Sequence, residues 1–165
     1  MTKQRQPGFR VHGSLTTIRP ATAEDVDLLV AWHADPEVAR FWDDETYTRE
    51  EMEARLTRAD VQAFVVEEAE TPVGYIEAWT DDGRSGGVDM FLSPDARGRG
   101  LGPDAARALA RHLRDDRGWK PVTVDPYLSN DGAVRAWRRA GFEPIGVREP
   151  DDEHRDPWLL MEFRG

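Results

Sequence analysis

The sequence predicts a single α/β (α+β) domain, and three observations support this fold class. The length of 165 residues fits one domain with a full hydrophobic core. Apolar runs typical of strands alternate with helix-patterned segments along the chain. One such run, residues 88–92, leads through a glycine-rich turn into the helical pattern of residues 105–113. This strand, turn and helix carry the most specific functional signal in the chain.

Two capping boxes mark helix starts in the first half of the chain, Thr22 with Asp25 and Thr48 with Glu51. A turn signal at residues 70–72 joins two β-rich runs and predicts a hairpin. The strands expected in this half are residues 15–19, 61–68, 73–80 and 88–92.

The second half continues the alternation. After the glycine-rich turn we expect a helix that ends near Arg114. Ser129 or Asn130 is expected to cap a further helix, which Gly141 ends. The strands expected here lie around residues 121–125, 144–147 and 158–163.

The composition is typical of an ordinary globular protein, with 39 % apolar and 33 % charged residues. No apolar run approaches the roughly 20 residues of a membrane span. Residues 1–13 are polar and lack the apolar core of a secretion signal. We therefore expect a flexible leader at residues 1–13, a domain at residues 14–165 and a location in the cytoplasm. The chain lacks cysteine, and its four histidines show no ligand spacing, so we expect neither disulfides nor a metal site.

Charge is unevenly distributed along the chain. The formal net charge is −10, yet residues 97–139 carry ten Lys and Arg against five Asp and Glu, a net of +5. This split favours an anion at the basic segment and a cationic ligand elsewhere, and it argues against nucleic acid. Arg107, Arg111 and Arg114 are expected to form only the solvated face of a helix.

The glycine turn is the main candidate for ligand binding. Glycine lets the backbone approach a ligand closely and adopt positive φ, and the following helix N-terminus favours an anion. We therefore expect its amides to hold a pyrophosphate; the alternative is a surface turn that only ends a strand and starts a helix. A Walker loop is excluded because Pro103 follows the last glycine, and no dinucleotide fingerprint is present. The turn consists of Arg97, Gly98, Arg99, Gly100, Leu101 and Gly102.

The Arg-x-x-Gly-x-Gly spacing of this turn resembles the acyl-CoA-binding turn of the GCN5-related N-acetyltransferases (GNAT). The resemblance extends over residues 15–163, and within that superfamily the chain looks most like the aminoglycoside 6'-N-acetyltransferases. It implies the GNAT fold, a single mixed, mostly antiparallel sheet flanked by helices. The local matches are Phe41-Trp42, Gly74-Tyr75-Ile76-Glu77, Gly87-Val88-Asp89, Asp125-Pro126, Ser129-Asn130 and Ala140-Gly141-Phe142.

The resemblance implies an acetyl-CoA-dependent N-acetyltransferase acting on a small polycationic amine, with the 6'-amino group of an aminoglycoside antibiotic as the favoured acceptor. Acetyl-CoA is then the cosubstrate, held by the glycine turn and Asn130, with no metal, nucleic acid or membrane partner and a monomer or weak homodimer as the working state. One alternative is an acyltransferase for a siderophore-type lysine or a protein N-terminal amine. Another is a catalytically silent acyl-CoA-binding module.

Asp89 is the candidate catalytic residue. It lies between Val88 and Met90 on an expected central strand, where an unpaired charge is costly to bury. By similarity to the family, it contacts or deprotonates the acceptor amine. The alternative is a salt bridge to an arginine such as Arg97.

Further carboxylates are candidates for binding the ammonium groups of a substrate. Asp125 ends a strand at its carboxyl end, where open α/β sheets place ligand-binding groups, and the family holds a substrate ammonium there; ordinary Asp-Pro turn chemistry is the alternative. Glu77 shares one strand face with aromatic residues, a combination that suits a cation. Trp42 and Asp43 offer the same pairing from a loop, and Asp156 is the expected match to a substrate-binding aspartate of the family.

The chain departs from the family at Trp137. A tyrosine commonly stands at this place in the helix after Asn130, where its hydroxyl protonates the CoA thiolate. The indole N–H is not usefully acidic. Either CoA leaves as the thiolate, or Tyr127 or a water supplies the proton, or the chain only binds acyl-CoA.

Overall fold

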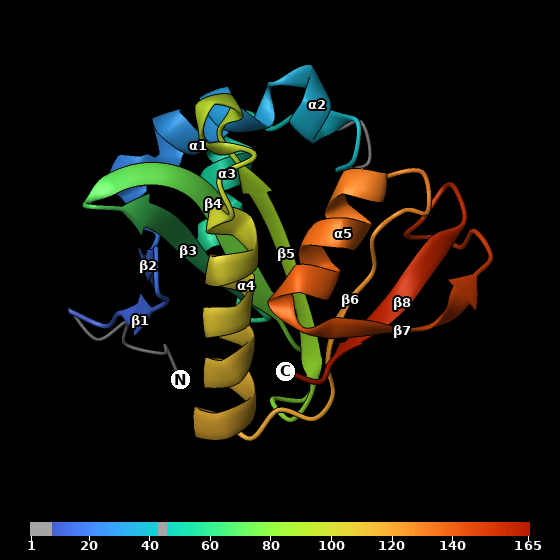
Figure 1. Cartoon of the computed structure of the whole chain (residues 1–165). Helices are drawn as coiled ribbons and strands as arrows, with labels where there is room; N and C mark the ends of the chain where they lie inside the picture. Colours follow the sequence, from blue (N-terminus) through green and yellow to red (C-terminus); the bar gives the residue numbers. More distant parts are fainter. Residues whose placement is uncertain (1–7, 43–45) are drawn as a thin grey trace.

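An eight-stranded sheet runs through the described part of the chain (Figure 1). The computed structural model describes residues 8–42 and 46–165. The strand order is β1-β2-β3-β4-β5-β6-β8-β7, and neighbouring strands are antiparallel except β5 and β6, which are parallel. The mixed, mostly antiparallel sheet expected from the sequence is therefore confirmed. The strands are β1 (Val11–His12), β2 (Thr17–Pro20), β3 (Val61–Glu68), β4 (Thr71–Trp79), β5 (Gly86–Leu92), β6 (Val122–Val124), β7 (Phe142–Arg148) and β8 (Trp158–Phe163).

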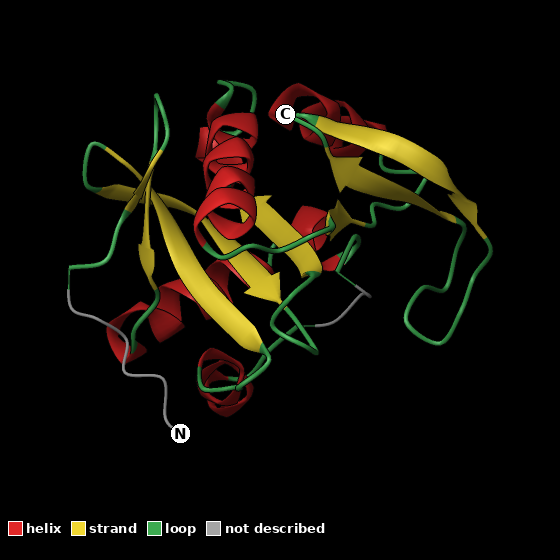
Figure 2. Cartoon of the chain, turned by 90° about the horizontal axis from the view of Figure 1, so that it is seen from below, coloured by secondary structure: helices red, strands yellow, loops and turns green. Residues whose placement is uncertain are grey.

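Helices cover both faces of this sheet (Figure 2). On one face, α4 and α5 pack against each other, and on the other α1 packs against α3. Short 3₁₀ turns precede α1 and the glycine turn, and a π-helical turn follows α4. The helices are α1 (Val26–His33), α2 (Pro36–Ala39), α3 (Arg49–Leu56), α4 (Leu101–Arg111) and α5 (Asp131–Ala140).

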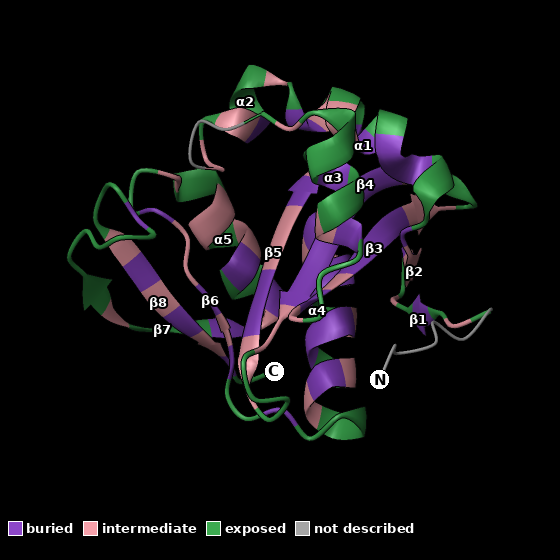
Figure 3. Cartoon of the chain, turned by 180° about the vertical axis from the view of Figure 1, so that it is seen from behind, coloured by how far each residue is buried: buried purple, intermediate pink, exposed green. Residues whose placement is uncertain are grey.

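The sheet separates two hydrophobic cores because side chains alternate along each strand. On β3, Phe64 and Val66 belong to the core beneath α4, whereas Ala63 and Val65 belong to the core beneath α1 and α3. Figure 3 shows the resulting burial of the central strands and of the inner face of α4. Both faces of the centre of the sheet are thus rigidly packed, which fixes the positions of side chains at its strand ends.

Side-chain caps start two helices where the sequence predicts them. The Thr48 hydroxyl accepts a hydrogen bond from the amide of Glu51 at 3.2 Å, and the Asn130 side chain accepts one from the amide of Ala133 at 3.1 Å. Gly141 ends α5 with a φ of 107°, a conformation that favours glycine. The cap of α5 also orients the start of that helix, which lines the cleft described below.

The structure differs from the sequence-based expectation at two places, the N-terminal segment and the tip of the β3–β4 hairpin. Val11–His12, inside the expected leader of residues 1–13, forms strand β1 because the apolar Val11 is buried against the core. The tip of the β3–β4 hairpin is Ala69 and Glu70 rather than residues 70–72. Both tip residues have positive φ, the backbone of a two-residue hairpin turn, so strand β4 already begins at the next residue.

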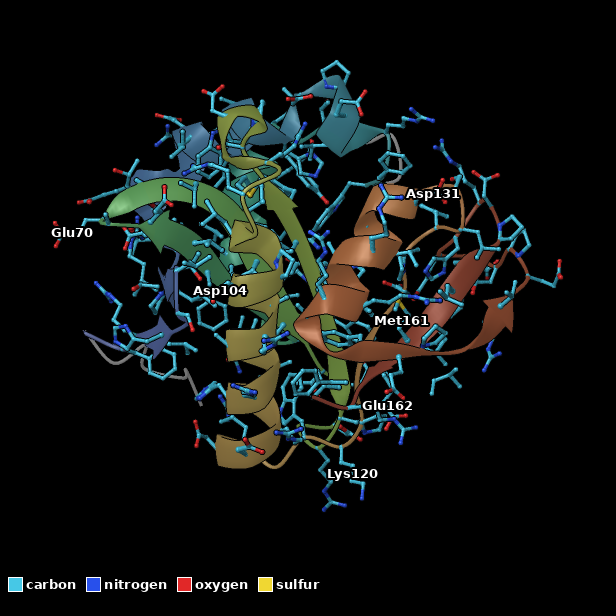
Figure 4. The ribbon with its side chains drawn as sticks, viewed as in Figure 1. Glu70, Asp104, Lys120, Asp131, Met161 and Glu162 are labelled. Carbon is cyan, nitrogen blue, oxygen red and sulfur yellow. The ribbon has the colours of Figure 1, made fainter. Side chains whose placement is uncertain are left out.

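Asp104, labelled on α4 in Figure 4, fastens the turn before β2 to this helix. Its carboxylate accepts hydrogen bonds from the amides of Ser14, Leu15 and Thr16 at 2.9 to 3.0 Å and from the Thr16 hydroxyl at 2.7 Å. Burial raises the pKa of Asp104, but these hydrogen bonds outweigh it and leave the pKa below its ordinary value. The ionised side chain therefore stabilises the N-terminal strands.

We predict that Asp104→Ala lowers the free energy of unfolding by about 1–3 kcal/mol at neutral pH, because the donors lose a charged acceptor. Since the folded-state pKa is lowered, this stabilisation is present above the ordinary aspartate pKa and disappears as the pH falls through the lowered value. Urea titrations at pH 7 and pH 3 measure it. Asp115→Ala, which removes an exposed carboxylate beyond the same helix, is the control; an equal loss in both variants at pH 7 would contradict the prediction.

Candidate active site

A cleft opens where β5 and β6 separate. Their parallel pairing consists of Gly86 with Val122 and Gly87 with Thr123, after which β5 continues to Leu92. The cavity along this part of β5 has a volume of about 1270 Å³, and its walls come from α2, β4, the glycine turn, α5 and the β7–β8 connection. Ligand pockets commonly measure roughly 300–1,000 Å³, so this cleft has room for two substrates together.

The glycine turn forms one end of the cleft. Gly98 and Gly100 have φ angles of 77° and 78°, in the left-handed region, and Gly100 is the N-cap of α4. The first amides of a helix lack partners within the helix, so the start of α4 presents donors and the positive end of its dipole to the cleft. The expected positive φ is confirmed at these two glycines.

Gly102 does not fit the same expectation. It lies inside the first turn of α4, is buried and has no positive φ. A Cβ at this position would lie 3.2 Å from Cε of Met90 and 3.4 Å from Cδ1 of Leu92. The absence of a side chain at Gly102 therefore lets the start of α4 pack closely on β5, which is a different role from that of Gly98 and Gly100.

The other expected cofactor residues divide into two groups. Arg97 and Asn130 line the cleft, and Arg97 also lies 3.9 Å from Asp35. The side chain of Arg99 turns away and pairs with Glu68 at 2.8 Å, while Leu101 is buried in the core beneath α4. The side chains of these last two residues therefore do not line the cleft.

α5 adds two arginines that the sequence reading left out. Arg135 and Arg139 are exposed and line the cleft. They lie four residues apart and therefore on the same side of the helix. Together with Arg97 they bring three of the ten Lys and Arg residues of the segment 97–139 to the cleft.

Three carboxylates that line the cleft, on β4, on β5 and just after β6, lie close enough for their charges to interact with Asp89 in the middle. Glu77 on β4 is the register partner of Asp89 on β5. Asp89 and Asp125 each lie two residues beyond the Gly87–Thr123 pair, so they stand at the same level on β5 and after β6. The alternation of β5 places Asp89 and Phe91 on the face of α1 and α3.

Asp89 has a perturbed environment. Burial raises the pKa of its carboxylate well above the ordinary value, and the carboxylates of Asp125 and Glu77 raise it further, while Arg55 and a hydrogen bond with Trp79 lower it. Among the described residues no cation forms a salt bridge with Asp89, and Arg97 lies near Asp35 instead. The alternative of an Asp89–Arg97 ion pair is thus not supported. A carboxylate with a raised pKa and no cationic partner is suited to accepting a proton near neutral pH.

Glu77 is not the free carboxylate that we expected for substrate binding. It is 1 % exposed, and Arg55 on α3 donates to both of its oxygens, with Nε at 2.9 Å. The Tyr75 hydroxyl donates to the same carboxylate. A buried carboxylate of this kind requires a charged partner, and Arg55 supplies it from a helix far away in the sequence. The negative charge of Glu77 is therefore offset within the protein.

Trp42 lies in the aromatic wall beside this ion pair. Its indole N–H donates to the Tyr47 hydroxyl at 3.2 Å, and its ring packs edge-on against Phe91 at 5.8 Å. The Arg55 guanidinium lies 5.5 Å from the same ring. Trp42 lines the cleft as expected, whereas Asp43 lies outside the described residues.

Asp125 faces the cleft but shares its charge with a histidine. His154, from the β7–β8 connection, lies with Nε2 2.7 Å from one Asp125 oxygen and Nδ1 2.8 Å from Asp151. The hydrogen bond with Asp125 raises the pKa of His154 to about 9, with burial opposing and Asp151 supporting the shift. No local motif signals this contact, because it joins residues 29 positions apart.

The β7–β8 connection forms the remaining wall. Asp151, Asp152 and Glu153 line the cleft, whereas Asp156 does not and pairs with Arg155 at 3.3 Å. Asp156, the residue expected to bind substrate, is therefore not part of the cleft lining, and the three acidic residues that are part of it lie earlier in the loop. Arg155 also donates to the backbone carbonyl of Arg40 at 3.1 Å, which links this loop to the residue after α2.

Trp137 stands inside the cleft on α5. It is 7 % exposed and packs edge-on against Phe142 at 5.4 Å. Tyr127, the expected alternative proton donor, lines the same cleft from the segment after β6. The indole side chain is therefore a well-packed wall of the cleft.

Two features of residues 8–42 and 46–165 concern metal ions and membranes. They contain no group of three or more His, Asp or Glu side chains arranged to hold a metal ion. None of their helices has the length and apolar character that crossing a membrane requires.

Comparison with known proteins agrees with this geometry. Residues 16–143 match the family model of the acetyltransferase (GNAT) domain. The aminoglycoside N(6')-acetyltransferase type 1 of Serratia marcescens is 30 % identical, over 90 % of this chain and 87 % of that protein. A relative with the same description from Klebsiella pneumoniae is also 30 % identical, over 82 % of this chain and 78 % of its own length.

Among solved structures, aminoglycoside acetyltransferase AAC(6')-Ib in complex with coenzyme A and kanamycin has a TM-score of 0.76 and 25 % identity, covering 89 % of this chain and 93 % of that one. A complex of the same enzyme that contains acetyl-CoA has a TM-score of 0.79 at 24 % identity, over 91 % of this chain and 93 % of its own. The fold, the glycine turn at the start of α4 and these matches lead to one assignment: the chain belongs to the GNAT acetyltransferases and, within them, is a relative of the aminoglycoside N(6')-acetyltransferases.

Proposed function

We propose that this protein transfers the acetyl group of acetyl-CoA to the 6'-amino group of an aminoglycoside. The observation that carries the proposal is Asp89, a carboxylate with a raised pKa and no cationic partner, placed between the glycine turn and an acidic wall. The names of the relatives support the substrate class. We further propose the cytoplasm as the place of action, because the reaction consumes acetyl-CoA.

The basic end of the cleft fits the pyrophosphate of acetyl-CoA. Gly98 and Gly100 hold the backbone in left-handed conformations at the start of α4, and a Cβ on Gly98 would meet no atom within 4 Å, so the turn is open to a ligand. Arg97, Arg135 and Arg139 surround this end with positive charge. Acetyl-CoA, when bound there, supplies the acyl thioester.

The acidic end of the cleft fits a polycationic amine. Asp125 keeps one oxygen free of His154, and Asp151, Asp152 and Glu153 face the same space. Trp42 and Tyr127 add aromatic walls, which attract ammonium groups. In this proposal Glu77 acts indirectly, by holding Arg55 beside the aromatic wall.

Asp89 lies where the two ends meet and is proposed to accept the proton of the attacking amine. The amine nitrogen forms a bond to the thioester carbonyl carbon, its proton passes to Asp89 directly or through a water, and the carbon–sulfur bond breaks to release CoA thiolate. Because ionised Asp89 is required, activity should fall as the pH drops through its raised pKa.

The proposed function is tested by measuring thiol release from acetyl-CoA with a panel of aminoglycosides, polyamines, lysine derivatives and peptides. We expect turnover with aminoglycosides, and mass spectrometry with NMR should place the acetyl group on the 6'-nitrogen. Turnover confined to peptides or lysine derivatives would instead support the other acceptor class. Tight binding of CoA without turnover on any amine would support the silent module.

Removing the Asp89 base should slow the chemical step. We predict that Asp89→Asn, which keeps shape and hydrogen bonding, lowers kcat by roughly 10²- to 10⁴-fold. The acidic limb of the kcat/KM profile, expected above the ordinary aspartate range in the natural protein, should disappear in this variant. Asp95→Asn, an exposed carboxylate next to the glycine turn, is the control. An unchanged kcat in folded Asp89→Asn would remove Asp89 from the mechanism.

Restricting the glycine turn should weaken cofactor binding. We predict that Gly100→Val reduces acetyl-CoA affinity at least about tenfold by calorimetry, because a β-branched residue resists a φ of 78° and the turn amides shift. Gly118→Val is a matched control, since Gly118 has a φ of 71°, equally open surroundings and no place in the cleft. If both variants bind acetyl-CoA as the natural protein does, the turn does not hold the cofactor.

A further inference from the structure

His154 lies in the acidic wall of the cleft, which also contains Asp125, Asp151, Asp152 and Glu153. Its two ring nitrogens lie 2.7 Å from Asp125 and 2.8 Å from Asp151, and the whole residue is 8 % exposed. A carboxylate only accepts hydrogen bonds when ionised, so each ring nitrogen must carry a proton and the ring is an imidazolium. The pKa of about 9 agrees with this charge state at neutral pH.

Aromatic packing fixes the plane of this ring. His154 stacks on Trp158 with a centroid distance of 4.2 Å and an interplanar angle of 14°, and it meets Tyr127 edge-on at 5.9 Å. The Asp151 carboxylate also accepts the backbone amides of Glu153 and His154 at 3.0 and 2.8 Å. The loop therefore holds the imidazolium against Asp125 through its own hydrogen bonds as well as through stacking.

Among the described residues, His154 is the cation that pairs with Asp125, the carboxylate proposed to bind a substrate ammonium. The groups that face it are Asp125 after β6, Asp151 on its own loop, and the rings of Tyr127 and Trp158; Asp89 in turn lies close enough to Asp125 for the two charges to interact. The neighbouring Arg155 pairs with Asp156 and the Arg40 carbonyl instead. Thus one protein cation already sits on a carboxylate to which a substrate ammonium is proposed to bind.

We propose that His154 is a specificity-determining residue: its imidazolium is a built-in cation of the acceptor pocket that shares Asp125 with the substrate and disfavours an additional ammonium group nearby. The inference rests on the proposed function, because it takes the acidic end of the cleft as the acceptor site. The ligand class it concerns is aminoglycosides that differ in the number of amino groups on the sugar ring carrying the reacting amine.

The discriminating experiment compares two aminoglycosides with the same reacting amine, one carrying a hydroxyl and the other an amine at one further position of that ring. In His154→Gln, which keeps a hydrogen-bonding side chain without the charge, kcat/KM for the more cationic compound should rise about tenfold relative to the other. Tenfold corresponds to about 1.4 kcal/mol, a reasonable size for repulsion between cations that share one carboxylate.

His112→Gln is the matched control, because His112 also pairs with a carboxylate, Asp116 at 2.8 Å, but lies outside the cleft. Its preference between the two compounds should equal that of the natural protein. An unchanged preference in folded His154→Gln, or the same change in His112→Gln, would overturn the inference.

Two further measurements keep the test decisive without turnover. In the natural protein, NMR titration should give His154 a midpoint near 9, and Asp125→Asn should lower it; an ordinary midpoint would overturn the inference.

Calorimetric binding of the same two aminoglycosides should show the tenfold shift even if acetyl transfer, and with it the proposed function, fails. Should His154→Gln not fold, His154→Asn replaces it with the same expected shift in preference, and the titration of the natural protein needs no His154 variant at all; no shift would again overturn the inference.

Discussion

The whole cleft depends on how briefly β5 and β6 pair. At Gly86 a Cβ would lie 2.0 Å from the backbone oxygen of Trp79, and at Gly87 it would lie 2.3 Å from the Trp79 indole. Only glycine permits this close contact of β5 with Trp79 on β4, and the same two glycines form the two residue pairs between β5 and β6. Beyond them the edge of β5 is free of β6, so its backbone groups and the side chains at both strand ends are left to serve a ligand.

The same divergence explains why three carboxylates in one region have three different states. Glu77 lies on the antiparallel β3–β4–β5 side, where α3 covers the sheet and Arg55 offsets its charge. Asp125 lies beyond the end of β6, where the β7–β8 loop reaches it and offers His154. Asp89 lies between them and forms no ion pair in the described residues, although the charge of Arg55 lowers its pKa in part. Burial and its negative neighbours therefore raise the pKa of Asp89 with no ion pair to offset them, which sets this proposed proton acceptor apart from Glu77 and Asp125, whose charges are shared with cations.

The sequence predicted the elements well because their signals are local. Thr48 and Asn130 are caps, Gly98 and Gly100 take left-handed conformations, and both are properties of a few consecutive residues. The misjudged residues depend on contacts across the fold. The offset charge of Glu77 requires Arg55 on another element, and the packing role of Gly102 is visible only once β5 lies beneath α4. His154 carries no motif at all, since the partner that gives it a role lies 29 positions earlier in the chain.

Trp137 sets a final constraint on the chemistry. Its ring is buried against Phe142 and lines the cleft, so it shapes the wall at a place where it has no useful acidity to offer. The amine must nevertheless lose a proton, and Asp89, whose pKa is raised, is the group proposed to receive it. A thiolate is a far weaker base than an alkoxide, because thiol pKa values lie near 8.5. Departure of CoA as the thiolate therefore needs no donor on α5, and the loss of a hydroxyl at Trp137 is compatible with turnover as long as Asp89 is ionised.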